Sequence, residues 1–314
     1  MRSIASLLGR RVLQALLAAL FVSSLCFFMV RFLPGDIAFD IASGRYGQEM
    51  TTQAAAAEVR AELGLDKPMA AAWLSSVSAL ARFDLGRSYT LGKPVWGLIR
   101  EQLGHTLQLS GLAMLFSLFI GPPIGIIAAL RPGGLVDRLN LLGSALLRAL
   151  PPFATGIILI IIFAASLHWL PAAGHTQRGT IILPALTLAL GLAAVSSRVV
   201  RSAMIDVARS AYFHFPLTKG LPLSTVVLRH GVRNMAVPVI AHLAMQFVYL
   251  IEGVIVVETL FAWPGIGHAL SHAVRERDIP LIQGAVLVMA ILFVLFNMVI
   301  DLVLVALDPR MRAR

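Results

Sequence analysis

Long apolar segments alternate with polar ones along this chain of 314 residues. An apolar segment of about 20 residues, rising about 1.5 Å per residue as a helix, can cross a hydrocarbon layer about 30 Å thick. The pattern therefore predicts an all-α protein that crosses a membrane several times. The six predicted spans are Val12–Val30, Leu103–Leu130, Leu139–Leu167, Ile181–Ala203, Met235–Phe261 and Leu281–Leu307.

The first span follows a basic start, as the apolar region of a signal peptide does. It is longer than the roughly 7–15 residues typical of such a region, and no small-residue cleavage pattern follows it. We expect it to remain as the first membrane helix. Arg2, Arg10 and Arg11 precede it, and such basic residues favour the cytoplasmic side.

Residues 32–102 form the one long hydrophilic segment, which this orientation places outside the cytoplasm. Two stretches within it, 51–64 and 68–80, have helix-like patterns bounded by Gly and Pro. The tails and short loops carry 14 basic residues on the predicted cytoplasmic side and three, Arg178, Arg275 and Arg277, on the other. This asymmetry predicts that both termini are cytoplasmic.

A polar interruption at 198–234 separates the fourth and fifth spans. It contains one acid, Asp206, and it must lie outside the lipid. Its positive charge predicts a cytoplasmic loop. The basic residues are Arg198, Arg201, Arg209, Lys219, Arg229 and Arg233.

Composition supports a membrane protein. Hydrophobic residues make up 58% of the chain and charged residues 13%, against about 25% charged in an ordinary globular domain. The net charge of +10 is mostly arginine spread along the chain, with no basic run beside stacking aromatics. We interpret it as topogenic charge and as contacts with anionic headgroups, not as a nucleic-acid surface. The single cysteine, Cys26, cannot form an intrachain disulfide.

The sequence lacks the common catalytic and nucleotide-binding motifs. A phosphate loop needs Gly-Lys followed by Ser or Thr, but Lys67 and Lys93 precede Pro and Lys219 precedes Gly. We therefore predict no catalytic, cofactor-binding or metal-binding residues. His268 and His272 stand four residues apart and could share a helical face as metal ligands, but without a third ligand interfacial polar histidines are the favoured interpretation.

Polar residues inside the spans are costly in lipid and usually face a cavity or a partner. Candidates for a translocation path are Glu252, Gln246, Asn297 and Glu258. For Glu252 the alternative is a buried hydrogen bond between helices. For Glu258, near the outer end of its span, the alternative is a position at the membrane interface. Pro122 and Pro123, with the glycines beside them, are expected to break the second helix, and Pro151-Pro152 the third.

Taken together, many ordered motifs resemble the inner-membrane permease subunits of ABC importers for dipeptides, oligopeptides and nickel or nickel chelates. The resemblance runs nearly end to end, and any one motif alone would be weak. The motifs are FLPGD (32–36), LGLDKP (63–68), FDLGRS (83–88), HTLQLS (105–110), LPPF (150–153), ILPALTLAL (182–190), RVVRSAM (198–204), KGL (219–221), LRHGVRNMAVPVI (228–240), VVETLFAWPGIG (256–267), RDIPLIQG (277–284) and NMVIDLVLVALDPR (297–310).

This resemblance implies that residues 206–221 form a short cytoplasmic coupling helix and its flanks, which dock on an ATPase subunit. Gly220 can adopt positive φ and end the helix. Pro216 departs from the usual family pattern and is expected in the first turn of the helix or at a break. The predicted coupling residues are Asp206, Ala211, Tyr212, Phe213, Phe215, Pro216, Thr218, Lys219, Gly220 and Leu221.

The resemblance further implies a six-helix type I importer permease in the bacterial inner membrane. Its expected parts are 1–31 (tail and first helix), 32–102 (extracytoplasmic loop), 103–307 (permease core with cytoplasmic loop 204–230) and 308–314 (cytoplasmic tail). It would form half of the pore with a homologous permease. An extracytoplasmic binding protein would deliver the solute, and two partner subunits would bind ATP and magnesium.

The sequence also leaves open three alternatives: an exporter of the same architecture, a polytopic membrane enzyme and an ion-driven secondary transporter. The solute is also open. Peptides, nickel chelates and opine-like metallophores are all carried by relatives that share these motifs. Dependence on a binding protein and on ATP would separate these alternatives.

Overall fold

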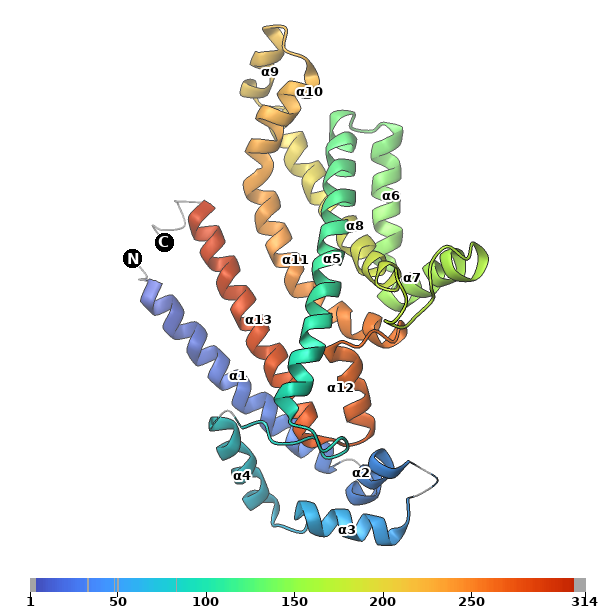
Figure 1. Cartoon of the computed structure of the whole chain (residues 1–314). Coiled ribbons are helices and arrows are strands. Elements are labelled where there is room, and N and C mark those ends of the chain that lie inside the picture. Colours follow the sequence, from blue (N-terminus) through green and yellow to red (C-terminus); the bar gives the residue numbers. More distant parts are fainter. Residues whose placement is uncertain (1–3, 33, 48, 50, 83, 308–314) are drawn as a thin grey trace. The chain divides into compact units, whose positions relative to one another are not determined.

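The computed structural model describes residues 4–32, 34–47, 49, 51–82 and 84–307. This part of the chain is helical and holds no strand beyond an isolated bridge between Arg87 and Pro94, which confirms the all-α prediction. The elements in Figure 1 are α1 (Ile4–Phe32), α2 (Ile37–Tyr46), α3 (Gln53–Leu63), α4 (Met69–Ala81), α5 (Val95–Leu130), α6 (Leu135–Ala149), α7 (Pro152–Leu159), η2 (Ile160–Ser166), α8 (Ile182–Ala208), α9 (Ala211–Thr218), α10 (Leu223–Val226), η3 (Val227–Val232), α11 (Arg233–Leu260), α12 (Ile266–Arg275) and α13 (Ile279–Leu307).

Four of the predicted spans are single helices that are long and apolar enough to cross a membrane: Arg11–Met29 within α1, then α5, α8, and Ile279–Ile300 within α13. The fifth predicted span coincides with α11, a helix of 28 residues. The predicted tail at 308–314 lies outside the described residues.

The third predicted span is a bent pair of helices. α6 ends before Pro151-Pro152, and α7 continued by η2 departs at 108°. Leu150 has the extended conformation that a following proline imposes, and Pro152 opens α7, where its missing N–H costs nothing. The predicted break at these two prolines is confirmed.

The predicted break at Pro122 and Pro123 is wrong. Both prolines lie inside α5, which continues to Leu130. Gly121 and Gly125 present bare backbone to α8, where an added Cβ at Gly121 would lie 3.0 Å from Ala193 O. This close packing against α8 holds the helix together despite the two missing N–H donors.

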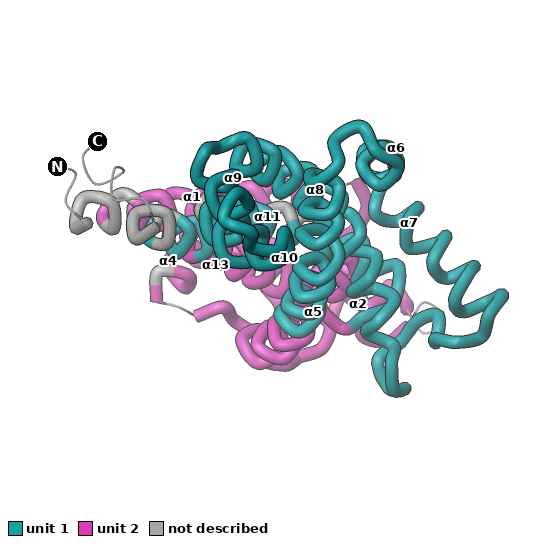
Figure 2. The backbone as a smooth tube through the Cα atoms, turned by 90° about the horizontal axis from the view of Figure 1, so that it is seen from above, with its two compact units in different colours: residues 1, 107–263, 296–314 teal, residues 2–106, 264–295 magenta. Residues whose placement is uncertain are grey.

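The chain divides into two compact units, coloured in Figure 2. Unit 1 comprises residues 1, 107–263 and 296–314, and unit 2 comprises residues 2–106 and 264–295. The divisions fall within α5, between α11 and α12, and within α13.

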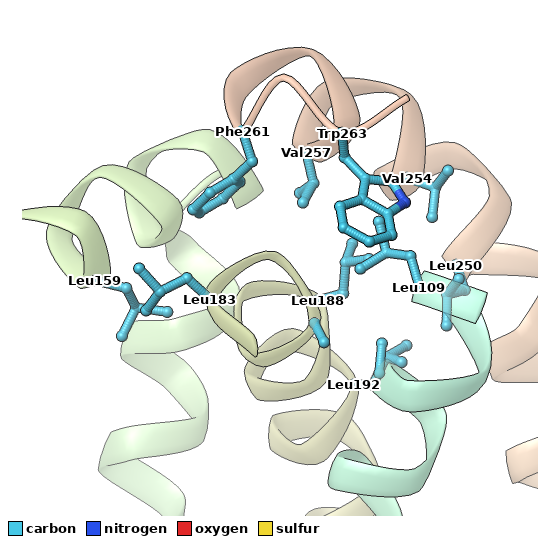
Figure 3. Close-up of a cluster of buried hydrophobic side chains, with 12 residues drawn as sticks. Leu109, Leu159, Leu183, Leu188, Leu192, Leu250, Val254, Val257, Phe261 and Trp263 are labelled. Atoms are coloured by element: carbon cyan, nitrogen blue, oxygen red, sulfur yellow. The ribbon is translucent and has the colours of Figure 1, made fainter. Parts of the chain in front are cut away.

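Unit 1 is built around α8, whose side chains are buried along most of its length. Leu183, Leu188 and Leu192 of α8 meet apolar residues of α5, α7 and α11, and Phe261 and Trp263 pack over one end of the cluster (Figure 3). A second apolar cluster joins α8 to α9 and α11 at the other end of α8.

Unit 2 contains the long hydrophilic segment. α3 and α4 coincide with the two helix-like stretches at 51–64 and 68–80, so those predictions are confirmed. α2, of ten residues, was not predicted. Asp36 caps it by accepting a hydrogen bond from Ala38 N at 2.9 Å, and Ile41 and Ala42 pack against Val59 of α3.

Candidate coupling loop and translocation site

The predicted coupling segment forms α9 and the turn that follows it. α9 is a helix of eight residues, and Gly220 after it has φ +81°. The predicted left-handed conformation of Gly220 is therefore confirmed. Its N–H donates to Leu217 O at 3.0 Å, and no atom lies within 4 Å of the position where a Cβ would stand.

The three aromatic residues of α9 divide into one core residue and two surface residues. Phe213 is 3% exposed and packs with Val200 and Met204 of α8. Tyr212 and Phe215 are 48% and 60% exposed. Phe213 therefore fixes α9 to α8, while Tyr212 and Phe215 form the accessible aromatic surface.

Pro216 is the sixth residue of α9 and is buried, so its expected place in the first turn or at a break is wrong. Because Pro216 has no backbone N–H, this short helix lacks only the hydrogen bond that would be donated to Tyr212 O. Its own carbonyl accepts hydrogen bonds from Lys219 N and Leu221 N, both at 3.2 Å, which close the end of the helix.

The remaining predicted coupling residues lie on this helix or next to it in the chain. Lys219 Nζ lies 4.4 Å from the centre of the Phe215 ring, a cation–π contact at the surface. Thr218 Oγ1 donates to Phe215 O at 2.8 Å. The other members of the set, all exposed, are Asp206, Ala211 and Leu221.

A buried ion pair ties α6 to α8. Asp137, in the first turn of α6, is 1% exposed and accepts two hydrogen bonds from Arg201, one of them at 2.7 Å from Nη2. Gly133 N donates to the same carboxylate at 2.8 Å. This bidentate pairing, with the hydrogen bond from Gly133, fixes the turn before α6 against α8.

The ion pair begins a polar stripe on α6. Asp137, Asn140, Ser144 and Arg148 follow one another at helical spacing and so share one face. The first three are buried, and Ser144 Oγ lies 3.2 Å from Ser197 Oγ of α8. The opposite face carries exposed leucines, so α6 turns its polar side toward the protein, as expected of a helix in lipid.

Two cavities in unit 1 meet at the end of this stripe. The larger, of about 790 Å³, extends along α8 from Val195 to Val207 and includes Arg198 and Asp206. The smaller, of about 400 Å³, lies among α6, α7, α8 and α11. Arg148 and Val195 line both, and therefore stand at their junction.

Of the predicted path residues whose side chains the structure describes, Gln246 alone lines one of these cavities. It is 2% exposed, its Nε2 donates to Leu192 O at 2.6 Å, and its Oε1 has no hydrogen-bond partner among the described residues. Glu258 is fully buried and, like Asn297 on α13, lines neither cavity. The side chain of Glu252 lies outside the described residues.

In unit 2, Asp278 joins two segments that are 190 residues apart in the chain. Its carboxylate accepts hydrogen bonds from the Ser88 hydroxyl, from Thr90 Oγ1 at 3.0 Å and from Tyr89 N at 3.1 Å. It also accepts one from Leu281 N at 3.3 Å, which caps the start of α13. The segments FDLGRS and RDIPLIQG thus meet at one buried carboxylate.

Ion pairs surround this junction. Arg277 Nε lies 2.8 Å from Asp40 Oδ2, and Arg277 also donates to Pro34 O. Arg45 pairs with Glu62 at 2.6 Å and, by this hydrogen bond, lowers the pKa of that carboxyl. Glu62 therefore contributes stability above its unfolded-state pKa, and that contribution is lost as the pH falls through its folded-state pKa.

His268 and His272 share one face of α12, with ring centres 4.7 Å apart, as their spacing predicted. Burial, with the nearby charges of His272 and Arg275, lowers the pKa of His268. Among the described residues no group of three or more His, Cys, Asp or Glu could hold a metal ion. The pair alone supplies two ligands, too few for a structural zinc site.

Two family models match the chain. One, for the N-terminal part of binding-protein-dependent transport system membrane components, matches residues 4–110. The other, for the binding-protein-dependent transport system inner membrane component, matches residues 121–313. The chain belongs to this family.

Relatives of this inner membrane component cover nearly its whole length. It is 34% identical to a probable peptide ABC transporter permease of Sinorhizobium fredii, over 96% of this chain and 98% of that protein. It is 36% identical to the glutathione transport system permease GsiC of Pectobacterium atrosepticum and of Escherichia coli K12, in each case over 96% of this chain and 97% of the relative.

The fold of this inner membrane component resembles two solved transporters. The MetNI methionine ABC transporter, in inward-facing conformations, matches with a TM-score of 0.54 and 15% identity, covering 69% of this chain and 100% of that one. An amino acid ABC transporter with histidines matches with a TM-score of 0.50 and 14% identity, covering 66% and 93%. The chain is thus a multi-pass permease component of an ABC importer and not an enzyme.

Sequence reasoning missed Arg148. It lies within a predicted apolar span, and an ionisable residue inside such a span is by default a candidate functional residue. Its spacing from Asp137, Asn140 and Ser144 was the signal that could have placed it on the inward face.

Proposed function

We propose that this chain is one of two permease subunits of an ATP-driven importer for peptides, including glutathione-like peptides. The names of the relatives support this class of solute. None of the relatives named above is described as a carrier of nickel or a metallophore, so those solutes are not part of the proposal. In the proposed importer, a second permease completes the pore, a binding protein delivers the solute, and two ATPase subunits bind ATP and magnesium.

One observation supports the proposed mechanism above others: α9 is fixed to the helix that lines both cavities. Phe213 packs against Val200 and Met204 of α8, and α8 also contributes residues to each cavity. When an ATPase subunit moves α9, the packed contact transmits that movement to α8. The cavities would then open alternately to the two sides of the membrane.

The proposed arrangement has six spans and both termini in the cytoplasm, with loop 204–230 on the ATPase side. The bent pair α6 and α7–η2 would be the third span, and α11 the fifth. The basic residues of the loop and of the turn before α6 support this orientation. Tyr212, Phe215 and Leu221 are exposed apolar residues, and we propose that an ATPase groove covers them.

Reconstituted transport tests this function. The complete complex in liposomes, with its binding protein, should accumulate radiolabelled glutathione or trialanine only when ATP is supplied on the ATPase side. An exporter would instead empty preloaded vesicles without the binding protein. Uptake that continues without ATP and collapses with an uncoupler would contradict the proposal and favour an ion-driven transporter.

A further inference from the structure

The polar stripe of α6 leads from a buried ion pair to an unpaired charge. Asp137 is neutralised by Arg201, and Ser144 contacts Ser197. Arg148, at the end of the stripe, is exposed and forms no ion pair with any described residue. A guanidinium stays charged at any physiological pH and is costly in hydrocarbon, so it has to face water or an anionic partner.

The surroundings of Arg148 define what such a partner would be. Arg198 lines the larger cavity with it. Asp206, the one acid among the described side chains that line either cavity, is two turns of α8 beyond Arg198. On the other side of the junction, the smaller cavity contains Gln246, His242 and the hydroxyls of Thr155 and Thr187. Among the described side chains, positive charge therefore prevails where the cavities meet.

The smaller cavity adds groups suited to a peptide. Gln246 Oε1 is buried without a partner among the described residues, and an unmet acceptor of this kind favours a ligand with an N–H group. Thr187 Oγ1 uses its hydrogen to bond Leu183 O at 2.8 Å, which leaves its lone pairs as acceptors. The remaining lining is largely apolar, as in most small-molecule sites.

We infer that Arg148 contacts a carboxylate of the passing solute, while Gln246 accepts a hydrogen bond from its peptide N–H. The subunit itself then selects solutes that carry a free carboxylate, in addition to the selection made by the binding protein. This inference rests on the proposed function and identifies the residues that recognise the solute. Arginine presents a planar fork that matches a carboxylate, so both charge and geometry matter at this position.

The test compares trialanine with trialanine amide, which lacks the free carboxylate. Uptake by the complete reconstituted complex is measured at saturating binding protein for the wild type, Arg148→Gln and Arg148→Lys. The matched control is Arg138→Gln, which removes an exposed arginine of α6 away from the polar stripe. Expression and basal ATP hydrolysis are measured for each variant to confirm assembly.

Arg148→Gln should reduce uptake of trialanine about tenfold, the size expected from losing one charge-assisted hydrogen bond. Uptake of the amide should stay at the wild-type value, and Arg148→Lys should retain much of the trialanine uptake because it keeps the charge. Equal losses for acid and amide, or trialanine uptake within twofold of the wild type, would overturn the inference. A wild-type complex that transports neither solute would instead contradict the proposed function.

Discussion

Gly220 gives the loop after α9 its shape. Its φ of +81° is a conformation that residues with a Cβ avoid, and its surroundings are open. A side chain added there would project freely from the surface proposed to meet the ATPase. A substitution at Gly220 can therefore block docking of the ATPase without preventing the subunit from folding.

Gly220→Trp should leave the amount of membrane-inserted subunit unchanged but prevent co-purification of the ATPase and abolish ATP-dependent uptake. The backbone cost of about 1–2 kcal/mol is small beside the steric block at the interface. Gly174→Trp is the matched control, because Gly174 also has positive φ and open space around it but lies outside loop 204–230. If the ATPase co-purified normally with the Gly220→Trp variant, the proposal that α9 lies in the interface would be contradicted.

Residue types alone predicted part of the loop. The left-handed glycine followed from the chemistry of Gly and was predictable. The burial of Phe213 could not be predicted, because Tyr212, Phe213 and Phe215 are all aromatic and close together in the sequence. Only the packing of Phe213 on α8 distinguishes it from the two exposed residues. Arg148 was missed because most of the residues that line the two cavities with it lie on other helices, far away in the chain.

At the scale of elements, the contact between α5 and α8 depends on two small residues. Gly121 and Gly125 are four residues apart, the small-xxx-small spacing that lets membrane helices approach closely. A Cβ at Gly125 would lie 2.4 Å from Ser197 O, a backbone atom that cannot move alone. One of the helices would have to shift.

Gly125→Ala should therefore destabilise the subunit by about 1–3 kcal/mol, as overpacking does, despite the better helix propensity of alanine. The midpoint of thermal unfolding in detergent measures this. Gly111→Ala on the same helix serves as the control, since no atom lies within 4 Å of its added Cβ, and it should be neutral or stabilising. Equal midpoints for the two variants would argue against tight packing at Gly125.

Helix positions were more predictable than helix continuity. The apolar length, which reflects the thickness of the membrane, located the start of α8 to within one residue and the end of α5 at Leu130. α5 nevertheless begins at Val95, eight residues before its predicted start. Whether a pair of prolines interrupts a helix could not be predicted from the sequence in the same way. Pro151-Pro152 ends one helix and starts another, whereas Pro122-Pro123 does neither, because packing against a neighbouring helix decides the outcome.

At the scale of the whole molecule, the proposed orientation can be tested with single cysteines. In a Cys26→Ser background, Glu58→Cys on α3 and Lys219→Cys after α9 both place a thiol at an exposed position. A membrane-impermeant maleimide should label Glu58→Cys in intact spheroplasts and Lys219→Cys only after permeabilisation. The reverse pattern would invert the proposed topology.

The Asp278 junction also constrains the order of events during synthesis. Ser88 and its neighbours leave the ribosome long before Asp278, and the whole of 107–263 is made in between. Until residue 278 has been made, residues 88–90 therefore lack the Asp278 carboxylate that accepts their hydrogen bonds. Contacts between residues so far apart in the chain form slowly. A ribosome that stalls before residue 278 would leave this part of the nascent chain open to proteases and chaperones.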